Sequence, residues 1–289
     1  MNQKKQSILV TGVGGMSGRR IAETLLRAGH DVYGLRRSPA DGDDPFKTIV
    51  ADLKDKPGLP EVDVLIHAAA TSPMPGVVNG DIVRDNVLGV MNLADWLAQG
   101  GARRVLFLSS LSVYGNIAGS SVNEETPFNA PDIYGTSKYL GEQILKDISS
   151  ALPALCFRLP GIVGRGATRN WIAGVLDKAR AGQEIEIYNP DAPYNNIVLV
   201  DDLAGFCLSL IETGWDGSDS MVLGCGGPVM LRTAVDAIIA AVGSGSAVKV
   251  AETDRNSFVI DDSHARGKYG YRSMDTVPAL ETFARASLD

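Results

Sequence analysis

The first 160 or so residues alternate short apolar runs with longer segments in which apolar residues recur at helical spacing. The runs are rich in β-branched residues and lack a regular polar alternation: SILVTG, DVYGLRR, TIVADL, DVLIHAAA, RRVLFLSS and ALCFRLPG. Strands of this kind are buried on both faces, as they are in a parallel sheet that helices cover on each side. The pattern therefore predicts an α/β fold with a doubly wound parallel sheet.

The pattern loosens after about residue 160. Helices are expected near 170–182 and 202–212, strands near 185–188 and 196–200, and short elements beyond them, with loops within 243–275. We expect one domain over residues 1–160. Residues 161–289 are expected to form mainly a smaller lobe, from which some elements return to the sheet.

Composition disfavours several classes of partner. The chain has 289 residues and a formal charge of −7, and its basic clusters are only two residues long, which disfavours binding to nucleic acid. No apolar run approaches the roughly 20 residues that span a bilayer, so we expect no membrane partner and place the protein in the cytoplasm. Three widely spaced cysteines fit buried thiols in a reducing compartment better than a metal site.

A glycine-rich turn, LVTGVGGMSGRR, follows the first apolar run and opens an amphipathic helix. Gly12, Gly15 and Gly18 recur every three residues, and Met16 lies in the same turn. Backbone without side chains lets a pyrophosphate approach N–H groups, and the helix N-terminus adds its positive dipole end. The turn predicts dinucleotide binding, with a ligand-free connector as the alternative. A phosphotransferase is disfavoured because no GK[ST] sequence occurs.

The sequence VYGLRRS at the end of the second strand carries Arg36, Arg37 and Ser38. At this place an acidic residue binds a free 2′-hydroxyl of the adenosine ribose, whereas an arginine accommodates a 2′-phosphate. The arginines therefore favour NADP(H) as the cofactor, while NAD(H) remains possible. The alternative is that both arginines are simply solvated.

Two further segments are candidates to line the cofactor. Asp52 and Leu53 follow the third strand, where a carboxylate can meet the adenine amino group. The segment HAAAT supplies small residues that let backbone lie against a cofactor: Ala68, Ala69 and Ala70.

The segment DIYGTSKYLGEQIL has helical spacing and places Tyr134 four residues before Lys138. Residues four apart on a helix share a face. A phenol with a pKa near 10 does not ionise at pH 7, but a neighbouring ammonium favours the phenolate and tunes the group for proton transfer. The pair predicts an acid/base couple; the alternative is a core tyrosine beside a surface lysine.

Several motifs occur together in one order along most of the chain. They are the G-x-x-G-x-x-G turn, DNVLGVMNLADWL, LFLSSLSVYG, DIYGTSKYLGEQIL, FRLPGIVG and IVLVDDLA. In this order the chain resembles the extended short-chain dehydrogenase/reductases, the NAD(P)-dependent epimerase/dehydratase family. The resemblance implies a Rossmann-type fold, with an NAD(P)-binding domain over 1–160 and a substrate-binding lobe over 161–289.

The resemblance also implies catalytic roles. Tyr134 would be the general acid/base, and Lys138 would lower the pKa of Tyr134 and hydrogen-bond the nicotinamide ribose. Ser110 would hydrogen-bond the reacting oxygen, with Ser109 and Ser112 as lesser candidates. Negative charge grows on a carbonyl oxygen as hydride arrives, and a tyrosine proton and a serine hydroxyl stabilise that charge.

Two more positions match the family's motifs. Asn86 matches an asparagine of the fourth helix that often belongs to a proton relay. The segment that would pass beside the nicotinamide carboxamide is Pro160, Gly161 and Ile162.

Family members of this length often act on nucleotide-activated sugars, which makes a nucleotide sugar the expected substrate. Many of them carry Arg-Asp-Phe before the VDD segment, with the arginine gripping a diphosphate, whereas YNNIVLVDD places Asn195 at that position. Either another arginine takes over the phosphates or the substrate lacks a diphosphate. The candidate substrate contacts are Thr71, Ser112, Arg165, Arg169, Asn170, Trp171, Tyr194 and Asn195.

The favoured hypothesis is an NADP(H)-dependent reductase of a keto-sugar, above all a nucleotide-linked 4-keto-6-deoxy sugar, with Tyr134 as proton donor. An NAD(P)-dependent nucleotide-sugar epimerase is the alternative, and a non-catalytic dinucleotide-binding sensor is the alternative from another class. Dehydration is disfavoured because Ser109 and Leu111 flank Ser110 where dehydratases of the family carry a glutamate. By analogy with relatives, the helices expected near 79–99 and 133–150 imply a homodimer.

Overall fold

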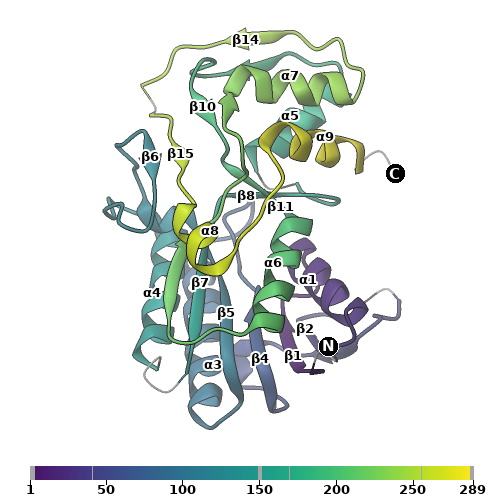
Figure 1. Ribbon diagram of the computed structural model, residues 1–289, viewed down its shortest axis with the longest axis vertical. Coiled ribbons are helices and arrows are strands. Elements are labelled where there is room, and N and C mark those ends of the chain that lie inside the picture. The colour runs from purple at the N-terminus through teal and green to yellow at the C-terminus, as the bar shows by residue number, and fades with distance from the viewer. Residues whose placement is uncertain (1–3, 41, 149–151, 169, 255, 287–289) are drawn as a thin grey trace. The chain divides into compact units, whose positions relative to one another are not determined.

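The structure is a computed structural model, and it describes residues 4–40, 42–148, 152–168, 170–254 and 256–286. The chain forms two compact units (Figure 1). The first comprises Met1–Asn116, Pro127–Arg158 and Leu203–Met221, and the second comprises Ile117–Thr126, Leu159–Asp202 and Val222–Asp289. The chain therefore passes between the two units more than once.

A seven-stranded sheet forms the centre of the first unit. Its strands, in the order β12–β7–β5–β4–β1–β2–β3, are β12 (Asp219–Val222), β7 (Ala154–Leu159), β5 (Ala102–Ser110), β4 (Val62–His67), β1 (Ser7–Thr11), β2 (Asp31–Arg36) and β3 (Lys47–Val50). β1 pairs in parallel with both of its neighbours, so that Val10 lies beside Gly34 and Ile66. The order runs outward from β1 in both directions, which confirms the predicted doubly wound α/β fold.

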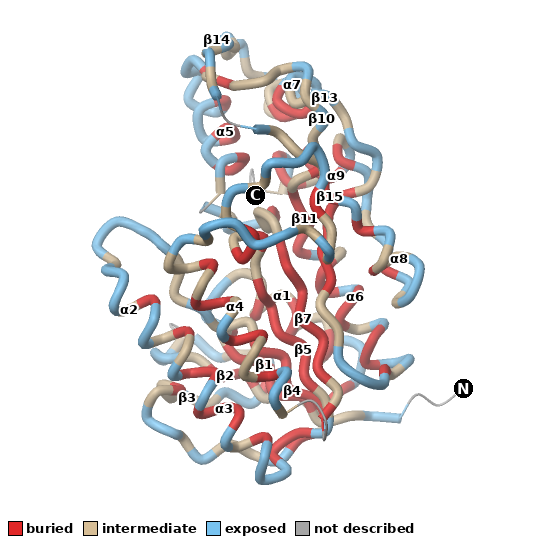
Figure 2. The backbone as a smooth tube through the Cα atoms, turned by 90° about the vertical axis from the view of Figure 1, so that its left-hand side faces the viewer, coloured by how far each residue is buried: buried red, intermediate tan, exposed pale blue. Residues whose placement is uncertain are grey.

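Helices cover both faces of this sheet (Figure 1). One face carries α1 (Met16–Arg27) and α6 (Val200–Thr213), and the other carries α3 (Gly89–Ala98) and α4 (Ile133–Asp147). The short helix α2 (Asn79–Val83) packs against α4 (Figure 2). Short 3-10 turns follow β3 and β5: η1 (Leu53–Asp55) and η3 (Leu111–Tyr114). The single helix expected over 79–99 is interrupted between α2 and α3 by one π-helical turn, η2 (Arg84–Leu88).

The central strands of the first unit are almost completely buried. Figure 2 shows mostly buried residues along β1, β4, β5 and β7. On the α3 face, Leu9 and Leu65 of the sheet belong to one apolar core with Leu93 and Leu97 of the helix. Burial of apolar area stabilises the folded state by about 25 cal/mol per Å². This core therefore fixes the strands whose carboxyl ends carry the loops of the site.

The described residues of the second unit form short strand pairs and four helices. Three pairs are parallel: β8 (Gly161–Val163) with β11 (Ile197–Leu199), β9 (Ile185–Ile187) with β14 (Val248–Val250), and β6 (Ser121–Val122) with β15 (Val259–Ile260). One pair is antiparallel: β10 (Pro193–Tyr194) with β13 (Val229–Met230). The helices are α5 (Trp171–Arg180), α7 (Leu231–Ala241), α8 (Ser263–Tyr269) and α9 (Thr276–Ala286).

α7 and α9 are longer than the short elements expected in this part of the chain. Each has 11 residues, and Val235, Ile238 and Phe283 contribute to a core that also includes α5. α7 has apolar positions at helical spacing, but its N-terminus lacks a side-chain cap, which is the usual signal for a helix start. The sequence pattern was present, whereas the boundary signal was not.

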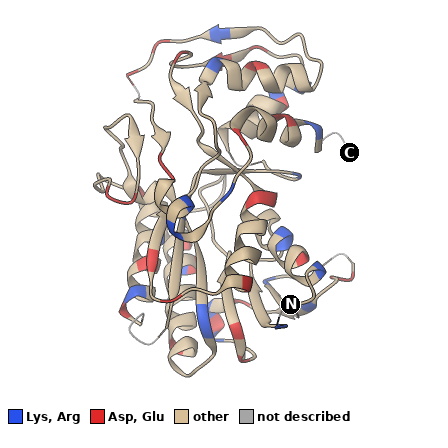
Figure 3. Ribbon diagram, in the orientation of Figure 1, with Lys and Arg blue, Asp and Glu red and all other residues tan. Residues whose placement is uncertain are grey.

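Charge and hydropathy add three facts about the described residues. Figure 3 shows Lys and Arg interspersed with Asp and Glu in both units. Within the described ranges, no helix has the length and apolar character needed to cross a membrane. The same part of the chain holds no group of three or more His, Cys, Asp or Glu side chains arranged to bind a metal ion.

Candidate active site

The glycine-rich turn joins β1 to α1 in a conformation that only glycine permits. Gly12 has φ +77°, and a Cβ there would lie 2.7 Å from the backbone nitrogen of Ala69. A Cβ on Gly18 would collide with the backbone oxygen of Gly12. α1 begins at Met16, and its N-cap residue Gly15 makes no side-chain cap. The uncapped N–H groups and the bare backbone fit the pyrophosphate of a dinucleotide.

The two arginines at the end of β2 each contact a carboxylate. Arg36 Nη1 lies 3.4 Å from Asp44 Oδ2, and Arg37 Nη1 lies 2.9 Å from Asp85 Oδ2. Ser38, the third member of this group, is exposed. The sequence interpretation treated the arginines as free to meet a 2′-phosphate or water. In the structure, however, each arginine has a carboxylate partner, which it shares with a second cation: Arg36 shares Asp44 with Arg19, and Arg37 shares Asp85 with Lys54.

The other candidate cofactor residues of the first unit serve partly structural roles. Asp52 Oδ1 accepts a hydrogen bond from the Lys54 backbone at 3.0 Å and so caps η1. Leu53 is buried in the apolar core. Ala69 donates its N–H to Thr11 Oγ1 at 3.2 Å, which fixes the small-residue segment after β4 beside the glycine-rich turn. Ala68 and Ala70 flank it.

Tyr134, Ser110 and Ser72 come together at the start of α4. The helix begins at Ile133, and Asp132 caps it by accepting the N–H of Gly135 at 2.7 Å. Burial raises the pKa of Tyr134, and hydrogen bonds with Ser72 and Ser110 only partly oppose this. Tyr134 therefore keeps its proton at neutral pH. Ser72 was missed by the sequence analysis, although it directly follows the candidate Thr71.

Lys138 lies one turn further along α4 and is 2% exposed. Its Nζ is 4.3 Å from the centre of the Phe107 ring, and burial lowers its pKa to about 8. We expected Lys138 to lower the pKa of Tyr134. That expectation is wrong for this structure, because burial dominates the pKa of Tyr134 and Lys138 is not among the groups that shift it.

Asn86 holds the loop after β4 against α4. Its Oδ1 accepts the N–H of Thr71 at 2.7 Å, and its Nδ2 donates to the Thr71 oxygen at 3.0 Å and to Ser137 Oγ at 2.9 Å. Thr71 also donates its hydroxyl to Asp85 at 2.6 Å. The π-helical turn brings Asn86 and Asp85 to this loop, and such turns often occur at functional sites. Both the oxygen and the nitrogen of the Asn86 side-chain amide are thus hydrogen-bonded.

A buried ion pair connects α4 to β7. Arg158 Nη2 lies 2.8 Å from Glu142 Oε2, and Arg158 Nη1 donates to Tyr114 Oη at 2.8 Å. Ser109 donates its hydroxyl to Glu142 at 2.5 Å, so this lesser candidate has a structural partner. Ser112 stays closer to the site, because its N–H donates to Ser110 Oγ at 3.1 Å.

In the second unit, the predicted residues gather around β8, β11 and the start of α5. Pro160 precedes β8, and a Cβ on Gly161 would lie 3.1 Å from the Cβ of Asn170. Asn170 caps α5 by accepting the Ala173 N–H at 2.8 Å and donates to the Ile162 oxygen at 2.8 Å. The Asn170 amide therefore connects the start of α5 to β8. Arg165 is exposed after β8, and Arg169 lies outside the described residues.

Two aromatic candidates lie together. Trp171, the first residue of α5, is 44% exposed, and its ring is 6.1 Å from that of Tyr194 in an edge-on contact. Burial raises the pKa of Tyr194. Trp171 is thus the more exposed member of this pair.

Asn195 has a different role from the one expected. Its side chain is buried, its Oδ1 accepts the Ile260 N–H at 2.8 Å, and its Nδ2 donates to the oxygens of Ile260 at 2.9 Å and Cys225 at 3.2 Å. The amide is fully used by main-chain partners. The interpretation of Asn195 as a substrate contact is therefore wrong: it ties together three segments of the second unit.

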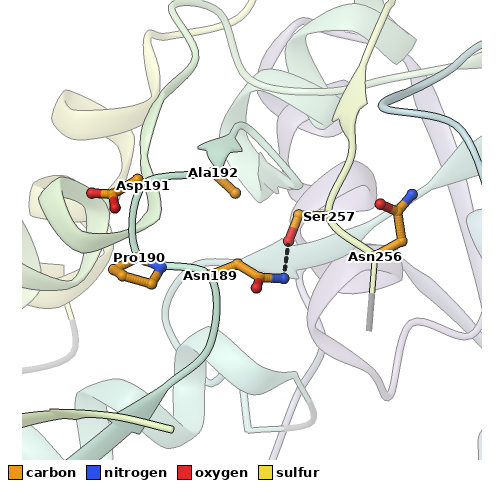
Figure 4. Close-up of a pocket in the computed structure, with 6 residues that line it drawn as sticks. All are labelled: Asn189, Pro190, Asp191, Ala192, Asn256 and Ser257. Atoms are coloured by element: carbon orange, nitrogen blue, oxygen red, sulfur yellow. Dashed lines mark hydrogen bonds between the residues drawn. The ribbon is translucent and has the colours of Figure 1, made fainter. Parts of the chain in front are cut away.

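A polar cleft of about 580 Å³ opens in the second unit (Figure 4). Its lining comprises Asn189, Pro190, Asp191, Ala192, Asn256 and Ser257. Figure 4 shows the Asn189 amide directed toward Ser257, to which it donates at 2.9 Å. The sequence analysis did not select these residues. The one local signal is the turn sequence YNPDAP, in which Asn189 adopts φ +49°.

Comparisons with known proteins point to one family. A family model described as "NAD dependent epimerase/dehydratase family" matches residues 8–224. A UDP-glucose 4-epimerase of Mycolicibacterium smegmatis is 28% identical over 262 residues, which is 82% of each chain. A UDP-glucose 4-epimerase of Bacillus subtilis is 29% identical over 164 residues, which is 50% of this chain and 48% of that protein. Several relatives are thus matched over only about half of their length.

The fold also matches solved structures. A Bifidobacterium longum UDP-glucose 4-epimerase, in complex with NAD+ and UDP, superposes with a TM-score of 0.78 over 96% of each chain at 21% identity. At this level of identity the likeness shows the fold alone.

Proposed function

Since the chain belongs to the NAD-dependent epimerase/dehydratase family, we propose that it is an epimerase that inverts a hydroxyl-bearing carbon of a nucleotide sugar. The observation that carries the proposal is the cluster of Tyr134, Ser110 and Ser72, with Lys138 buried one helical turn away. The relatives named above are UDP-glucose 4-epimerases. They favour epimerisation over the keto-sugar reduction that the sequence analysis preferred.

The reaction needs a group that takes a proton from a hydroxyl and later returns it. When bound, the nicotinamide supplies a reversible acceptor for the accompanying hydride. Tyr134 holds its proton at neutral pH and so is ready to donate it to an oxygen that gains negative charge. Ser110 adds a hydroxyl donor to the same oxygen, and Ser72 orients the phenol.

Lys138 supplies positive charge to this site. With a pKa of about 8, its ammonium is mostly protonated at pH 7. The Phe107 ring fixes the Nζ position through a cation–π contact at 4.3 Å. The proposed role of this fixed ammonium is to hydrogen-bond the nicotinamide ribose, one helical turn from Tyr134.

We assign NAD(H) as the cofactor and keep NADP(H) as the alternative to be tested. Arg36 and Arg37 suggested NADP(H) from the sequence, but each forms an ion pair with a carboxylate, Asp44 or Asp85. The Bifidobacterium longum structure holds NAD+. An epimerase regenerates its cofactor in each cycle and does not draw on cellular NADPH.

The second unit is the proposed site of the nucleotide sugar. Trp171 offers an exposed indole face for stacking, and the cleft around Asn189 and Ser257 offers amide and hydroxyl groups. These are groups that bind a base or a sugar by stacking and hydrogen bonding. The Bifidobacterium longum epimerase binds UDP, which supports a uridine nucleotide as the first ligand to test.

A homodimer is proposed through the α3–α4 face. Met91 on α3 is 49% exposed and Leu140 on α4 is 43% exposed, and a second copy would cover such apolar side chains. Met91→Lys combined with Leu140→Lys should yield a monomer in analytical ultracentrifugation. Val250→Lys, at a 52% exposed position in the second unit, should leave the oligomeric state unchanged.

The decisive experiment offers UDP-glucose and UDP-galactose separately to the purified protein and separates the products by anion-exchange chromatography. Interconversion without added reductant is expected, with NAD released when the protein is denatured. Tyr134→Phe should lower kcat by about 10²- to 10⁴-fold and retain the bound nucleotide. NADPH consumption with a nucleotide-linked 4-keto sugar, in the absence of interconversion, would instead establish the reductase.

A further inference from the structure

The geometry points to Asp44 as the residue that sets the cofactor preference, because its buried carboxylate holds Arg36 as a counter-ion and so disfavours a 2′-phosphate on the adenosine ribose. The inference rests on the proposed binding of a dinucleotide, but not on epimerisation. It reverses the simplest interpretation of the Arg36–Arg37 pair, in which two arginines at a strand end indicate NADP(H).

Asp44 is tied to three elements of the first unit. Its side chain is 2% exposed, and its Oδ1 accepts from Arg19 Nη1 of α1 at 2.9 Å. Its Oδ2 accepts from Thr48 Oγ1 of β3 at 2.8 Å and from Arg36 Nη1 of β2 at 3.4 Å. The neighbouring Asp43 is exposed. Asp44 is therefore an inward-facing carboxylate between two exposed neighbours, Asp43 and Pro45, in the connection from β2 to β3.

The carboxylate remains charged at neutral pH. Burial raises the pKa of Asp44, but hydrogen bonds from Thr48, Arg19 and Arg36 outweigh that effect and lower it overall. The ionised group is shared by Arg19 and Arg36 and so neutralises one of the two positive charges next to the glycine-rich turn.

Arg36 stands where the cofactor ribose is expected. It is the last residue of β2, and in doubly wound folds the ribose 2′-position is recognised at the end of this strand. Its guanidinium lies along the glycine-rich turn, since a Cβ on Gly14 would be 3.7 Å from Arg36 Nη2 and 3.8 Å from Nε. Arg36 Nε is buried and makes no hydrogen bond.

A 2′-phosphate and a 2′-hydroxyl make different demands on this arrangement. A phosphate carries up to two negative charges and would compete with Asp44 for Arg36 while being repelled by the carboxylate. A hydroxyl is neutral and needs one hydrogen bond, so it leaves the Asp44–Arg36 pair intact. The arrangement therefore selects NAD(H), and the selection comes from a repulsive element rather than from a new attractive contact.

The test compares Asp44→Asn with Asp43→Asn, which makes the same charge change one residue away at an exposed position. Binding of ADP-ribose and of 2′-phospho-ADP-ribose is measured by isothermal titration calorimetry, because neither ligand contains nicotinamide and no turnover is involved. The nucleotide that each variant carries after purification is identified by mass spectrometry.

Wild-type protein and Asp43→Asn should both bind ADP-ribose more tightly than its 2′-phosphorylated form. In Asp44→Asn, the ratio of the two dissociation constants should shift toward the phosphorylated ligand by about tenfold or more. The further change Arg36→Ala in the Asp44→Asn background should abolish that shift, because Arg36 is the group released to the phosphate. If Asp44→Asn does not fold, Asp44→Ser keeps a hydroxyl for Thr48 and Arg19 and serves the same comparison.

The outcomes separate the two proposals. An unchanged ratio in Asp44→Asn, an equal shift in Asp43→Asn, or a wild-type preference for the phosphorylated ligand overturns the role of Asp44 while dinucleotide binding stands. Failure of wild-type protein to bind either ligand, with no nucleotide retained after purification, overturns dinucleotide binding itself.

Discussion

Lys138 lies with its Nζ 4.3 Å from the centre of the Phe107 ring, and His67 stacks on the same ring at 5.5 Å. Burial lowers the pKa of His67 to about 3, and its Nδ1 shares a hydrogen bond with Thr11 Oγ1 at 2.7 Å. The histidine is therefore neutral. Phe107 thus contacts both a buried cation and a buried neutral ring, and among the described residues no carboxylate is in direct contact with the ammonium.

Stability should reveal the cost of burying this ammonium. The pKa of Lys138 is about 8 in the folded protein and 10.5 when unperturbed. Between these values the unfolded chain binds more protons, so the free energy of unfolding rises with pH in this window, by up to ~3 kcal/mol from this group. Urea denaturation of wild type and Lys138→Met at pH 7.5, 9 and 10.5 should show the stability of wild type rising relative to that of the variant, because the buried cysteines, whose raised pKa values lower stability above pH 9, are common to both. Parallel curves would mean that the ammonium is not buried in solution.

Ser72 should influence the pH dependence of turnover. Its hydrogen bond lowers the pKa of Tyr134, so Ser72→Ala should move the alkaline limb of the kcat profile to higher pH. Ser72→Thr keeps a hydroxyl and should restore the wild-type profile. An alkaline limb that stays in place in Ser72→Ala would show that another group controls it.

Glu142 should matter far more to folding than an exposed glutamate does. Glu142→Gln leaves the Arg158 guanidinium buried without its counter-ion, which costs about 3–5 kcal/mol in the free energy of unfolding. Glu281 pairs with Arg285 at 3.1 Å on the surface, and Glu281→Gln should cost less than about 1 kcal/mol. Denaturant titrations of the two variants make the comparison, and equal losses would contradict a buried pair.

Asn195 should behave as a structural residue. Asn195→Ala leaves the backbone groups of Ile260 and Cys225 without their partner, at a cost of about 1–3 kcal/mol per buried group that stays unpaired. The KM of the active protein should remain within about threefold of wild type, because the side chain reaches no ligand. A large rise in KM with unchanged stability would reinstate the substrate contact that the sequence suggested.

Local sequence was sufficient for the features that depend on a few neighbouring residues. The strands of the first unit follow from apolar runs, and the turn through Gly12 and Gly18 follows from glycine spacing beside a strand and a helix. The four-residue interval likewise places Tyr134 and Lys138 on one helix. Each of these features depends on the backbone of one continuous segment shorter than three helical turns. The local sequence is enough to predict the conformation of such a segment.

Features that depend on contacts between distant segments could not be predicted. The partner of Arg37 is 48 residues away and that of Asn195 is 65 residues away. The shift of the Tyr134 pKa depends on burial, and Lys138, only four positions away, does not contribute to it. Asp44 is closer to Arg36, but nothing in the sequence distinguishes it from the exposed Asp43. Tertiary packing decides between these alternatives.

The division of the chain into interleaved segments limits how this protein can be modified. Residues 117–126 contribute to one unit from within the sequence of the other, and residues 203–221 do the reverse. A fragment ending near residue 160 would lack the part of α6 and the edge strand β12 that belong with its sheet. Neither unit can therefore be exchanged as one continuous segment of sequence. New specificities are reached more readily by substitutions within loops than by exchange of a whole unit.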